Sequence, residues 1–203
     1  MNVEASKDPL VFQSGRKATV QQLGVQLNAS SHVARVDSEN PSSNLPYHNN
    51  QHAFTVAVNV VEGAEAHSLS DEQKRLLFIA ALYHDWDHTG TRDEKENIRR
   101  AVEGCLAGMR EDNESEADRW TVMLLIYATA QYFYNPPTLP LMKRLLRDAD
   151  MMQNMEPDRE TFFRGLSKEL GIVVDADTTF EFLNKHVFLT VWGKEKAQNY
   201  LET

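Results

Sequence analysis

Several features that would place a chain in a specialised class are nearly absent from this sequence. It contains one cysteine, Cys105, which excludes an internal disulfide and predicts a reducing, cytoplasmic setting. The N-terminus lacks the apolar core of a signal peptide. The longest uncharged run, 120–142, contains three prolines. Because a membrane span needs about 20 consecutive apolar residues, we expect none here.

An excess of basic residues is also absent. Lys and Arg number 21 against 30 Asp and Glu, which gives a net charge of −9. Because phosphate backbones are held by clustered Lys and Arg, this balance argues against a nucleic-acid-binding surface. It also means that a phosphate-bearing ligand would need local positive charge, which a bound metal ion would supply.

Strand-like alternation and internal repeats are missing as well, and most of the chain after Tyr47 has helical spacing. The expected helices cover 18–27, 47–62, 70–90, 91–109, 113–134, 140–150, 158–170 and 178–200. The Ser- and Asn-rich stretch 30–46 is expected to be a loop. The sequence therefore predicts an all-α fold with an N-terminal segment, partly loop, over residues 1–46 and one helical domain over residues 47–203.

Two pairs of histidines stand out in the helical part. His84 and His88 lie four residues apart with Asp85 directly after the first, and His48 and His52 form a similar pair upstream. Residues four apart on a helix share one face, so each pair can point into one interior. Imidazole nitrogens with a carboxylate oxygen are a ligand set for a cation of the Zn, Fe or Mn type. A lone histidine on a core helix is more often only hydrogen-bonded, but two such pairs favour a metal site.

A second carboxylate is expected from the helix that runs through residue 150. Asp148 and Asp150 diverge by about 200° around a helix, so they cannot both face one metal ion. Asp150 lies on the core side, whereas Asp148 lies one turn after Arg144 and is expected to pair with it in solvent. The candidate ligand set is therefore His52, His84, Asp85 and Asp150, with His48 and His88 nearby as unligated imidazoles.

These residues resemble the signature of the HD-domain metal-dependent phosphohydrolases. Within that superfamily, segments 47–53 and 84–91 are similar to two signature segments of the class I cyclic-nucleotide phosphodiesterases, and the resemblance extends from Tyr47 to about Asn154. It implies a single HD/PDEase-like catalytic domain over residues 47–203. It also implies one or two divalent ions, whether Zn, Mg, Mn or Fe, bound by His52, His84, Asp85 and Asp150, with Asp85 bridging to the second ion.

The same resemblance assigns roles to residues around the ligands. It makes His48 the proton donor to the leaving oxygen and His88 a residue that contacts the phosphate or supports a ligand. Tyr47, Asp87 and Glu96 are further candidates for substrate binding or ligand support. The chain departs from the family at Asp93, where the family has asparagine, and we find no counterpart of the C-terminal glutamine that holds the purine.

The chemistry of phosphoester cleavage supports a hydrolytic role. Cleavage at neutral pH needs an activated water, neutralised phosphoryl oxygens and a protonated leaving group. The sequence therefore predicts a metal-dependent phosphodiesterase that hydrolyses a nucleotide or 3′,5′-cyclic nucleotide through a metal-activated water, with His48 as general acid. Three alternatives use the same residues: a nucleotide phosphomonoesterase or pyrophosphohydrolase of the superfamily, a di-iron HD oxygenase, and a nucleotide-binding module without catalysis. The expected partner is a small-molecule phosphate ester.

Overall fold

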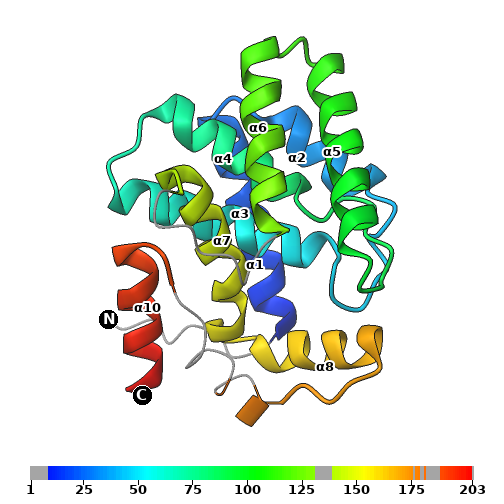
Figure 1. Cartoon of the computed structure of the whole chain (residues 1–203), viewed down its shortest axis with the longest axis vertical. Coiled ribbons are helices and arrows are strands. Elements are labelled where there is room, and N and C mark those ends of the chain that lie inside the picture. The colour runs from blue at the N-terminus through cyan, green and yellow to red at the C-terminus, as the bar shows by residue number, and fades with distance from the viewer. Residues whose placement is uncertain (1–8, 131–138, 176, 179–180, 182–187, 203) are drawn as a thin grey trace.

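The computed structural model describes residues 9–130, 139–175, 177–178, 181 and 188–202 (Figure 1). Every regular element among these residues is a helix, so the predicted all-α fold is confirmed. None of the described helices is long and apolar enough to cross a membrane. The elements are α1 (Pro9–Gln26), α2 (Ser30–Glu39), α3 (Asn50–Ala66), α4 (Asp71–Tyr83), α5 (Glu94–Glu111), α6 (Glu116–Thr129), α7 (Leu141–Met151), the 3₁₀ turn η1 (Met152–Met155), α8 (Arg159–Leu170) and α10 (Val191–Leu201).

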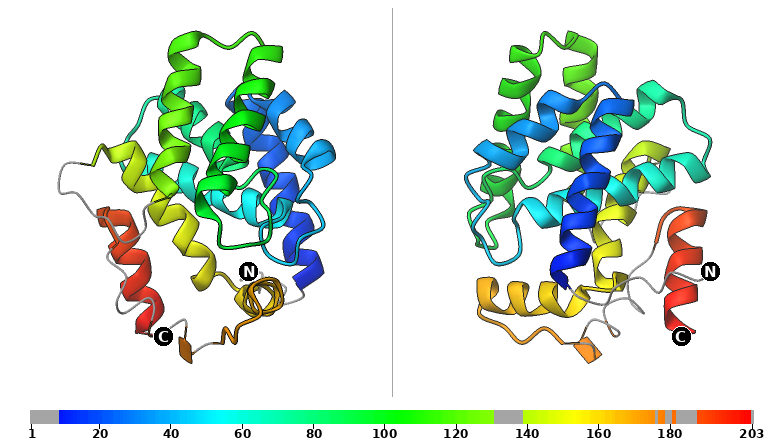
Figure 2. Two further views of the ribbon diagram at one scale, coloured as in Figure 1. Left: turned by 45° about the vertical axis from the view of Figure 1, so that its right-hand side comes forward. Right: turned by 180° about the vertical axis from the view of Figure 1, so that it is seen from behind.

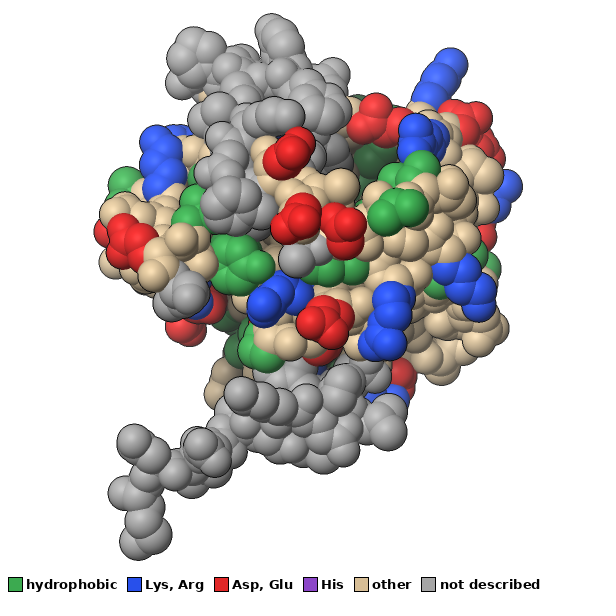
Figure 3. Space-filling view, turned by 90° about the horizontal axis from the view of Figure 1, so that it is seen from below, with side chains coloured by type: hydrophobic (Ala, Val, Ile, Leu, Met, Phe, Trp, Pro, Cys, Tyr) green, Lys and Arg blue, Asp and Glu red, His purple; other side chains and the backbone are tan. Residues whose placement is uncertain are grey.

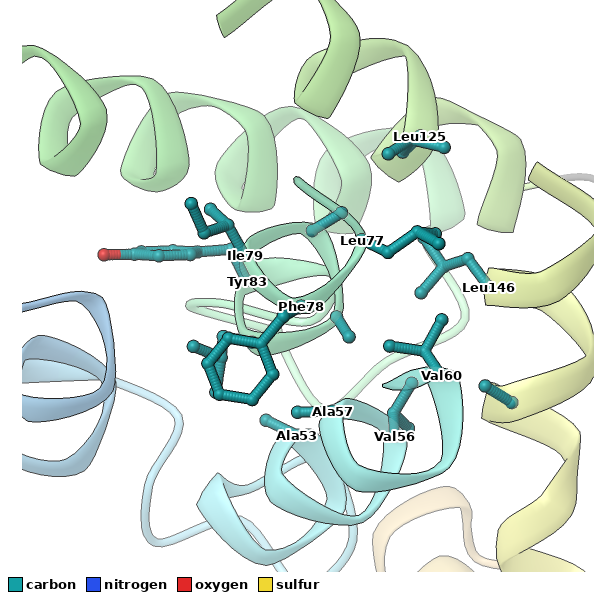
Figure 4. Close-up of a cluster of buried hydrophobic side chains, with 14 of the residues drawn as sticks. Ala53, Val56, Ala57, Val60, Leu77, Phe78, Ile79, Tyr83, Leu125 and Leu146 are labelled. Carbon is teal, nitrogen blue, oxygen red and sulfur yellow. The ribbon is translucent and has the colours of Figure 1, made fainter. Parts of the chain in front are cut away.

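Helices α3 and α4 form the centre of the molecule. They pack against each other, and α7 and α6 add a further layer beside them. The apolar side chains between these helices make the core, which Figure 4 shows with Val60 and Leu77 facing Leu146. At one end α5 and α6 stand side by side, and at the other end α8 lies across the bundle (Figures 1 and 2). The ends of α3 and α4 that carry the histidines therefore lie inside the bundle.

The N-terminal segment is more helical than predicted and is part of the same core. The expected helix over 18–27 begins at Pro9, and the expected loop over 30–46 begins with α2. The prediction for 30–39 was wrong because Val33 and Val36 lie on one helical face and are buried, and tertiary packing overrides the Ser-rich composition. Arg16 on α1 also forms an ion pair with Asp158, at the start of α8.

The predicted boundary at the start of α3 was wrong by three residues. The helix begins at Asn50 because the side chain of Asn49 caps it, accepting hydrogen bonds from the backbone N–H groups of Gln51 and His52. His48 therefore precedes the helix, although its ring still lies 5.9 Å from that of His52. The far end of α3 also differs, because it runs three residues past Gly63 to Ala66.

Most other predicted helix starts are close to the observed ones. The capping box at Ser70 and Gln73 is present, and α8 begins within a residue of the prediction. The helix expected to continue to Gly90 ends at Tyr83, and α5 is capped by Asp93 in place of Thr91. The predicted helix over 113–134 is observed as Glu116–Thr129, and its last residues lie outside the described part of the chain. The helix predicted over 178–200 is observed from Val191, and much of 178–187 also lies outside it.

Asp148 is not in solvent, which corrects the predicted pair with Arg144. Its carboxylate is fully buried and accepts hydrogen bonds from the backbone N–H groups of Leu189 (2.9 Å) and Thr190 (2.8 Å). The Thr190 hydroxyl donates a third, at 2.6 Å. The helix geometry correctly separated Asp148 from Asp150, but the side it faces is covered by the segment that begins α10. Asp148 therefore anchors α10 to α7.

The face of the molecule seen from below carries both signs of charge. Lys and Arg side chains alternate there with Asp and Glu, and apolar side chains lie between them (Figure 3). The basic side chains visible on this face do not gather into a single patch.

Candidate metal centre

Four side chains from three helical segments converge on one point. His52 on α3, His84 and Asp85 at the end of α4, and Asp150 on α7 face each other across the core. The distances from His52 Nε2 are 3.0 Å to Asp85 Oδ2, 3.2 Å to Asp150 Oδ1 and 3.1 Å to His84 Nε2. His84 Nε2 lies 3.0 Å from Asp85 Oδ2 and 3.6 Å from Asp150 Oδ1. Tertiary packing thus brings together the four residues expected to be ligands.

These spacings match those of ligands around one divalent cation. Ligand atoms at about 2.1 Å from a metal are separated by roughly 3.0 Å in an octahedral arrangement and 3.4 Å in a tetrahedral one. Two imidazole nitrogens and two carboxylate oxygens are also donors that Zn, Mn and Fe accept. The described residues contain two groups suited to a cation, and both include Asp85: one with His52 and His84, the other with His48 and His88. The residues present therefore fit the implied metal.

The Nδ1 side of both histidines in the cluster is also held by a hydrogen bond. His84 Nδ1 donates to the backbone carbonyl of Ala81 at 2.8 Å, and His52 Nδ1 is hydrogen-bonded to the side-chain carbonyl of Gln153. A neutral imidazole carries one N–H, so a proton on Nδ1 leaves the lone pair on Nε2. Both histidines can therefore present Nε2 to the shared centre, as ligand histidines usually do.

When the cluster holds no metal, its histidines tend to carry protons and so supply the positive charge. Burial lowers the pKa of His52, but its hydrogen bonds to Asp150 and Asp85 outweigh burial and raise that pKa to about 9. Burial also opposes charge on Asp150, yet His84 and His52 outweigh it and lower the pKa of that carboxyl to about 2. The cluster therefore favours positive charge at its centre, which a metal ion would supply in exchange for the protons.

His48 lies beside this centre and is held by Glu169 on α8. The Glu169 carboxylate contacts His48 Nδ1 and accepts hydrogen bonds from the backbone N–H groups of Tyr47 (2.9 Å) and His48 (3.2 Å). Burial alone would raise the pKa of Glu169, but the His48 hydrogen bond and charge outweigh it and lower that pKa. Glu169 is thus an anion that orients the His48 ring.

His88 stacks on His48 but has a different environment. The ring centroids are 3.6 Å apart. The His88 Nδ1 atom accepts a hydrogen bond from Gly90 N at 3.1 Å, and Nε2 lies 2.8 Å from Asn97 Nδ2. Burial, followed by the nearby His48, lowers the pKa of His88 to about 4. His88 is therefore neutral near pH 7 and has both ring nitrogens engaged within the protein.

A cavity of about 590 Å³ opens beside the cluster. This volume is within the usual range for small-molecule sites. One wall carries the histidines and carboxylates; the others are largely apolar, and Arg92 is the one Lys or Arg among the described residues that line it. The lining residues are Tyr47, His48, His52, Asp85, His88, Thr91, Arg92, Glu94, Asn97, Ile98, Thr129, Ala130, Asp150, Met151, Leu166, Leu170 and Ile172.

The three remaining candidate residues occupy different positions. Tyr47 is buried, lines the cavity, and places its ring 4.9 Å from that of His52. Asp87 and Glu96 do not line the cavity; both form ion pairs with Arg100, at 3.4 Å and 2.8 Å. The geometry therefore places Tyr47 against a ligand and puts Asp87 and Glu96 at the surface beside the site.

The comparison with protein families agrees with this geometry. Residues 47–102 match the 3′5′-cyclic nucleotide phosphodiesterase family, a range that includes His48, His52, His84, Asp85 and His88. The matched segment covers less than a third of the chain, so it shows a similarity of this segment to the family. At the level of the family, the match supports a metal-dependent hydrolase of the phosphodiesterase type. No curated protein matches the sequence. Asp150 lies beyond the matched range, so its place in this phosphodiesterase-like site comes from the fold alone.

Two residues that support the site, Glu169 and Gln153, were not predicted from the sequence. Glu169 gave no signal, because it lies 121 residues from His48 on an amphipathic helix rich in charge. Gln153 could have been found, since it follows Asp150 by three residues and so shares its side of the chain. Asn97 supports His88, and its carbonyl also accepts from Thr89 N at 3.0 Å.

Proposed function

We propose that the protein is a metal-dependent phosphodiesterase that hydrolyses a nucleotide or 3′,5′-cyclic nucleotide, with His48 as the general acid. The observation that carries the proposal is that His48, held by Glu169, lines the same cavity as His52, Asp85 and Asp150. A binding module would need the cluster to hold a phosphate, but it would have no use for an oriented proton donor.

The charge of the cavity supports the need for metal ions. Asp85, Asp150 and Glu94 line it, with Arg92 as the one basic side chain among the described lining residues. A phosphodiester anion would be repelled by this wall unless cations neutralised it. When bound by His52, His84, Asp85 and Asp150, divalent ions lower the pKa of water and neutralise phosphoryl oxygens.

The residues of the chain then account for the remaining steps. Hydrolysis forms a bond from water oxygen to phosphorus and breaks the bond from phosphorus to the ester oxygen. The ester oxygen leaves as an alkoxide and must gain a proton. Glu169 holds His48 Nδ1, so His48 Nε2 is the atom that donates this proton. His88, being neutral and engaged on both nitrogens, supports the face of the His48 ring.

The walls of the cavity favour an ester with a large apolar or aromatic group. Leu166, Leu170 and Ile172 line the side contributed by α8 and the residues that follow it, and Ile98 lines the side contributed by α5. A nucleoside base could lie between these walls while its phosphate reaches the cluster. This arrangement is the reason to propose a nucleotide in preference to a small inorganic or sugar phosphate.

The first experiment is a screen of the protein loaded in turn with Mn, Fe, Mg and Zn. Substrates would be 3′,5′-cyclic nucleotides, linear dinucleotides, nucleoside monophosphates and nucleoside triphosphates, with products identified by mass spectrometry. We expect cleavage of one ester bond in the diesters. Release of inorganic phosphate or pyrophosphate alone would favour the phosphomonoesterase or pyrophosphohydrolase, and oxygen consumption by the iron form would favour the oxygenase.

The second experiment tests the proton donor. His48→Ala should keep the metal content and slow hydrolysis of a ribose ester by about 10²–10⁴-fold. Bis(p-nitrophenyl) phosphate releases a phenolate that needs little protonation, so its hydrolysis should fall much less. His67→Ala, at the opposite end of α3, is the matched control and should leave both rates unchanged. Equal losses on the two substrates in His48→Ala would show that His48 is not the acid.

A further inference from the structure

One turn of chain holds both nitrogens of the His52 ring. Asp150, near the end of α7, lies 3.2 Å from His52 Nε2, and Gln153, in η1, places its side-chain carbonyl on His52 Nδ1. Gln153 and His52 are both buried, with 0% and 1% of their surface exposed. The chain tightens from α-helix to 3₁₀ turn at Met152, and tighter winding brings side chains three residues apart almost in line.

We propose that Gln153 is a positioning residue of the metal centre, whose side-chain carbonyl keeps the proton of His52 on Nδ1 and directs Nε2 to the metal. The inference rests on the metal site of the proposed function. His84 needs no such residue, because the backbone carbonyl of Ala81 accepts from its Nδ1. His52 is the ligand whose tautomer depends on a side chain.

A purely structural role does not explain a glutamine at this position. The amide nitrogen of Gln153 is buried and has no hydrogen-bond partner among the described residues. An unused buried N–H group opposes folding, so an apolar side chain of the same length would satisfy a packing requirement better. What glutamine adds is an acceptor for His52 Nδ1. The opposite amide orientation would donate to Nδ1 and move the His52 proton to Nε2, where it would block the ligand atom.

The test compares variants by their affinity for Zn²⁺, measured by competition with a chelating dye. Gln153→Met removes the acceptor with little change in length and should weaken Zn²⁺ binding by about 10–100-fold. Gln153→Glu keeps an acceptor and should bind within about threefold of wild type or more tightly. Asn154→Ala is the matched control: its side chain bonds the Met151 carbonyl in the same turn, and the variant should bind Zn²⁺ as wild type does.

Two outcomes would overturn the inference: wild-type affinity in Gln153→Met, or an equal loss in Gln153→Met and Gln153→Glu. If Gln153→Met does not fold, NMR spectroscopy of the wild-type protein, labelled with ¹⁵N-histidine and loaded with ¹¹³Cd²⁺, would show which nitrogen of His52 binds the metal. Coordination through His52 Nε2 with a proton on Nδ1 is expected, and coordination through Nδ1 would overturn the inference. Neither measurement uses a substrate. If the protein binds metal through His52 supported by Gln153 but cleaves no phosphate ester, the proposed function is refuted and this inference is not.

Discussion

His48 and His88 show how two identical side chains can be suited to opposite tasks. They stack on each other, and both lie near Glu169. The Glu169 carboxylate bonds His48 Nδ1, whereas it lies 3.6 Å from His88 Nδ1, which accepts from Gly90 N; His88 Nε2 lies beside Asn97. Burial, followed by the charge of His48, lowers the pKa of His88 and favours its neutral form. The proposal that His48 is the proton donor therefore rests on its environment and not on its residue type.

Glu169→Gln tests this assignment at the residue scale. The substitution removes the charge and leaves one acceptor oxygen for the three groups that Glu169 now holds. We expect hydrolysis of a ribose ester to slow by about 10-fold or more, with metal content unchanged. The upper limit is the loss of about 10²–10⁴-fold expected when the general acid itself is removed. The loss on bis(p-nitrophenyl) phosphate should be smaller. Metal loss in Glu169→Gln would show that Glu169 acts on the ligands.

At the scale of elements, the site depends on how closely α8 approaches the segment before α3. Gly165 lies one turn before Glu169, and a Cβ at this position would collide with the carbonyl oxygen of Pro46. The absence of a side chain allows Glu169 to reach the Tyr47 and His48 backbone. Gly165 is thus required because α8 lies so close to Pro46, and not because of an unusual backbone conformation.

Gly165→Ala should push α8 away from His48. We expect the free energy of unfolding to fall by about 1–3 kcal/mol, as for overpacked sites, and ribose-ester hydrolysis to fall with it. Urea titration and steady-state kinetics would measure both effects. Gly15→Ala on α1 is the control, because no atom lies within 4 Å of its Cβ position; it should be neutral or stabilising by about 0.4–1 kcal/mol. If Gly165→Ala has the stability and activity of the wild type, α8 and Pro46 are not as closely packed as described.

The contact between α7 and α10 gives a second prediction at this scale. Asp148→Ala leaves the N–H groups of Leu189 and Thr190 without their acceptor, so we expect a loss of about 2–3 kcal/mol in unfolding free energy. Zn²⁺ content should not change, because Asp148 faces away from Asp150. Asp71→Ala, at a side chain 93% exposed, should stay within about 0.5 kcal/mol of wild type. A metal loss in Asp148→Ala would place this residue in the site.

For the whole molecule, the metal cluster couples stability to pH. In the metal-free protein the pKa of His52 is raised to about 9, so its stabilisation is complete below its ordinary value of about 6.5 and is lost as pH rises toward 9. The pKa of Asp150 is lowered to about 2, so its stabilisation is present above about 3.8 and is lost as pH falls toward 2. The contribution of these groups is therefore greatest between about pH 4 and 6.5.

Metal binding should show the opposite dependence on pH. A histidine must be neutral to bind a metal ion, so the ion has to displace any proton that the histidine carries. At pH values below the raised pKa, the affinity should therefore increase about tenfold per pH unit for each proton displaced. We expect the affinity for Zn²⁺ to increase from pH 6 to 8, measured by chelator competition. Urea titration of the metal-free protein should show a lower unfolding free energy at pH 9 than at pH 6. A pH-independent affinity would mean that the histidines carry no protons to displace.

Local sequence signals were sufficient for the helices, the cap at Ser70 and the four candidate ligands. Apolar spacing and capping residues act over one or two turns, and the histidine and aspartate motifs lie within such short stretches. The same local rules separated Asp150 from Asp148, because residues two apart on a helix face different ways. They failed at α2, where the burial of Val33 and Val36 outweighed a loop-like composition.

The tertiary structure alone decided which distant residues meet. Glu169 reaches His48 across 121 positions, and Asp148 reaches Thr190 across 42, in each case because two helices dock. No local pattern encodes these pairings, since a carboxylate on an amphipathic helix looks the same whether it faces solvent or a histidine. The four clustered residues could thus be proposed as ligands from the sequence, while the contact of Glu169 with His48 and that of Gln153 with His52 followed from how the helices pack.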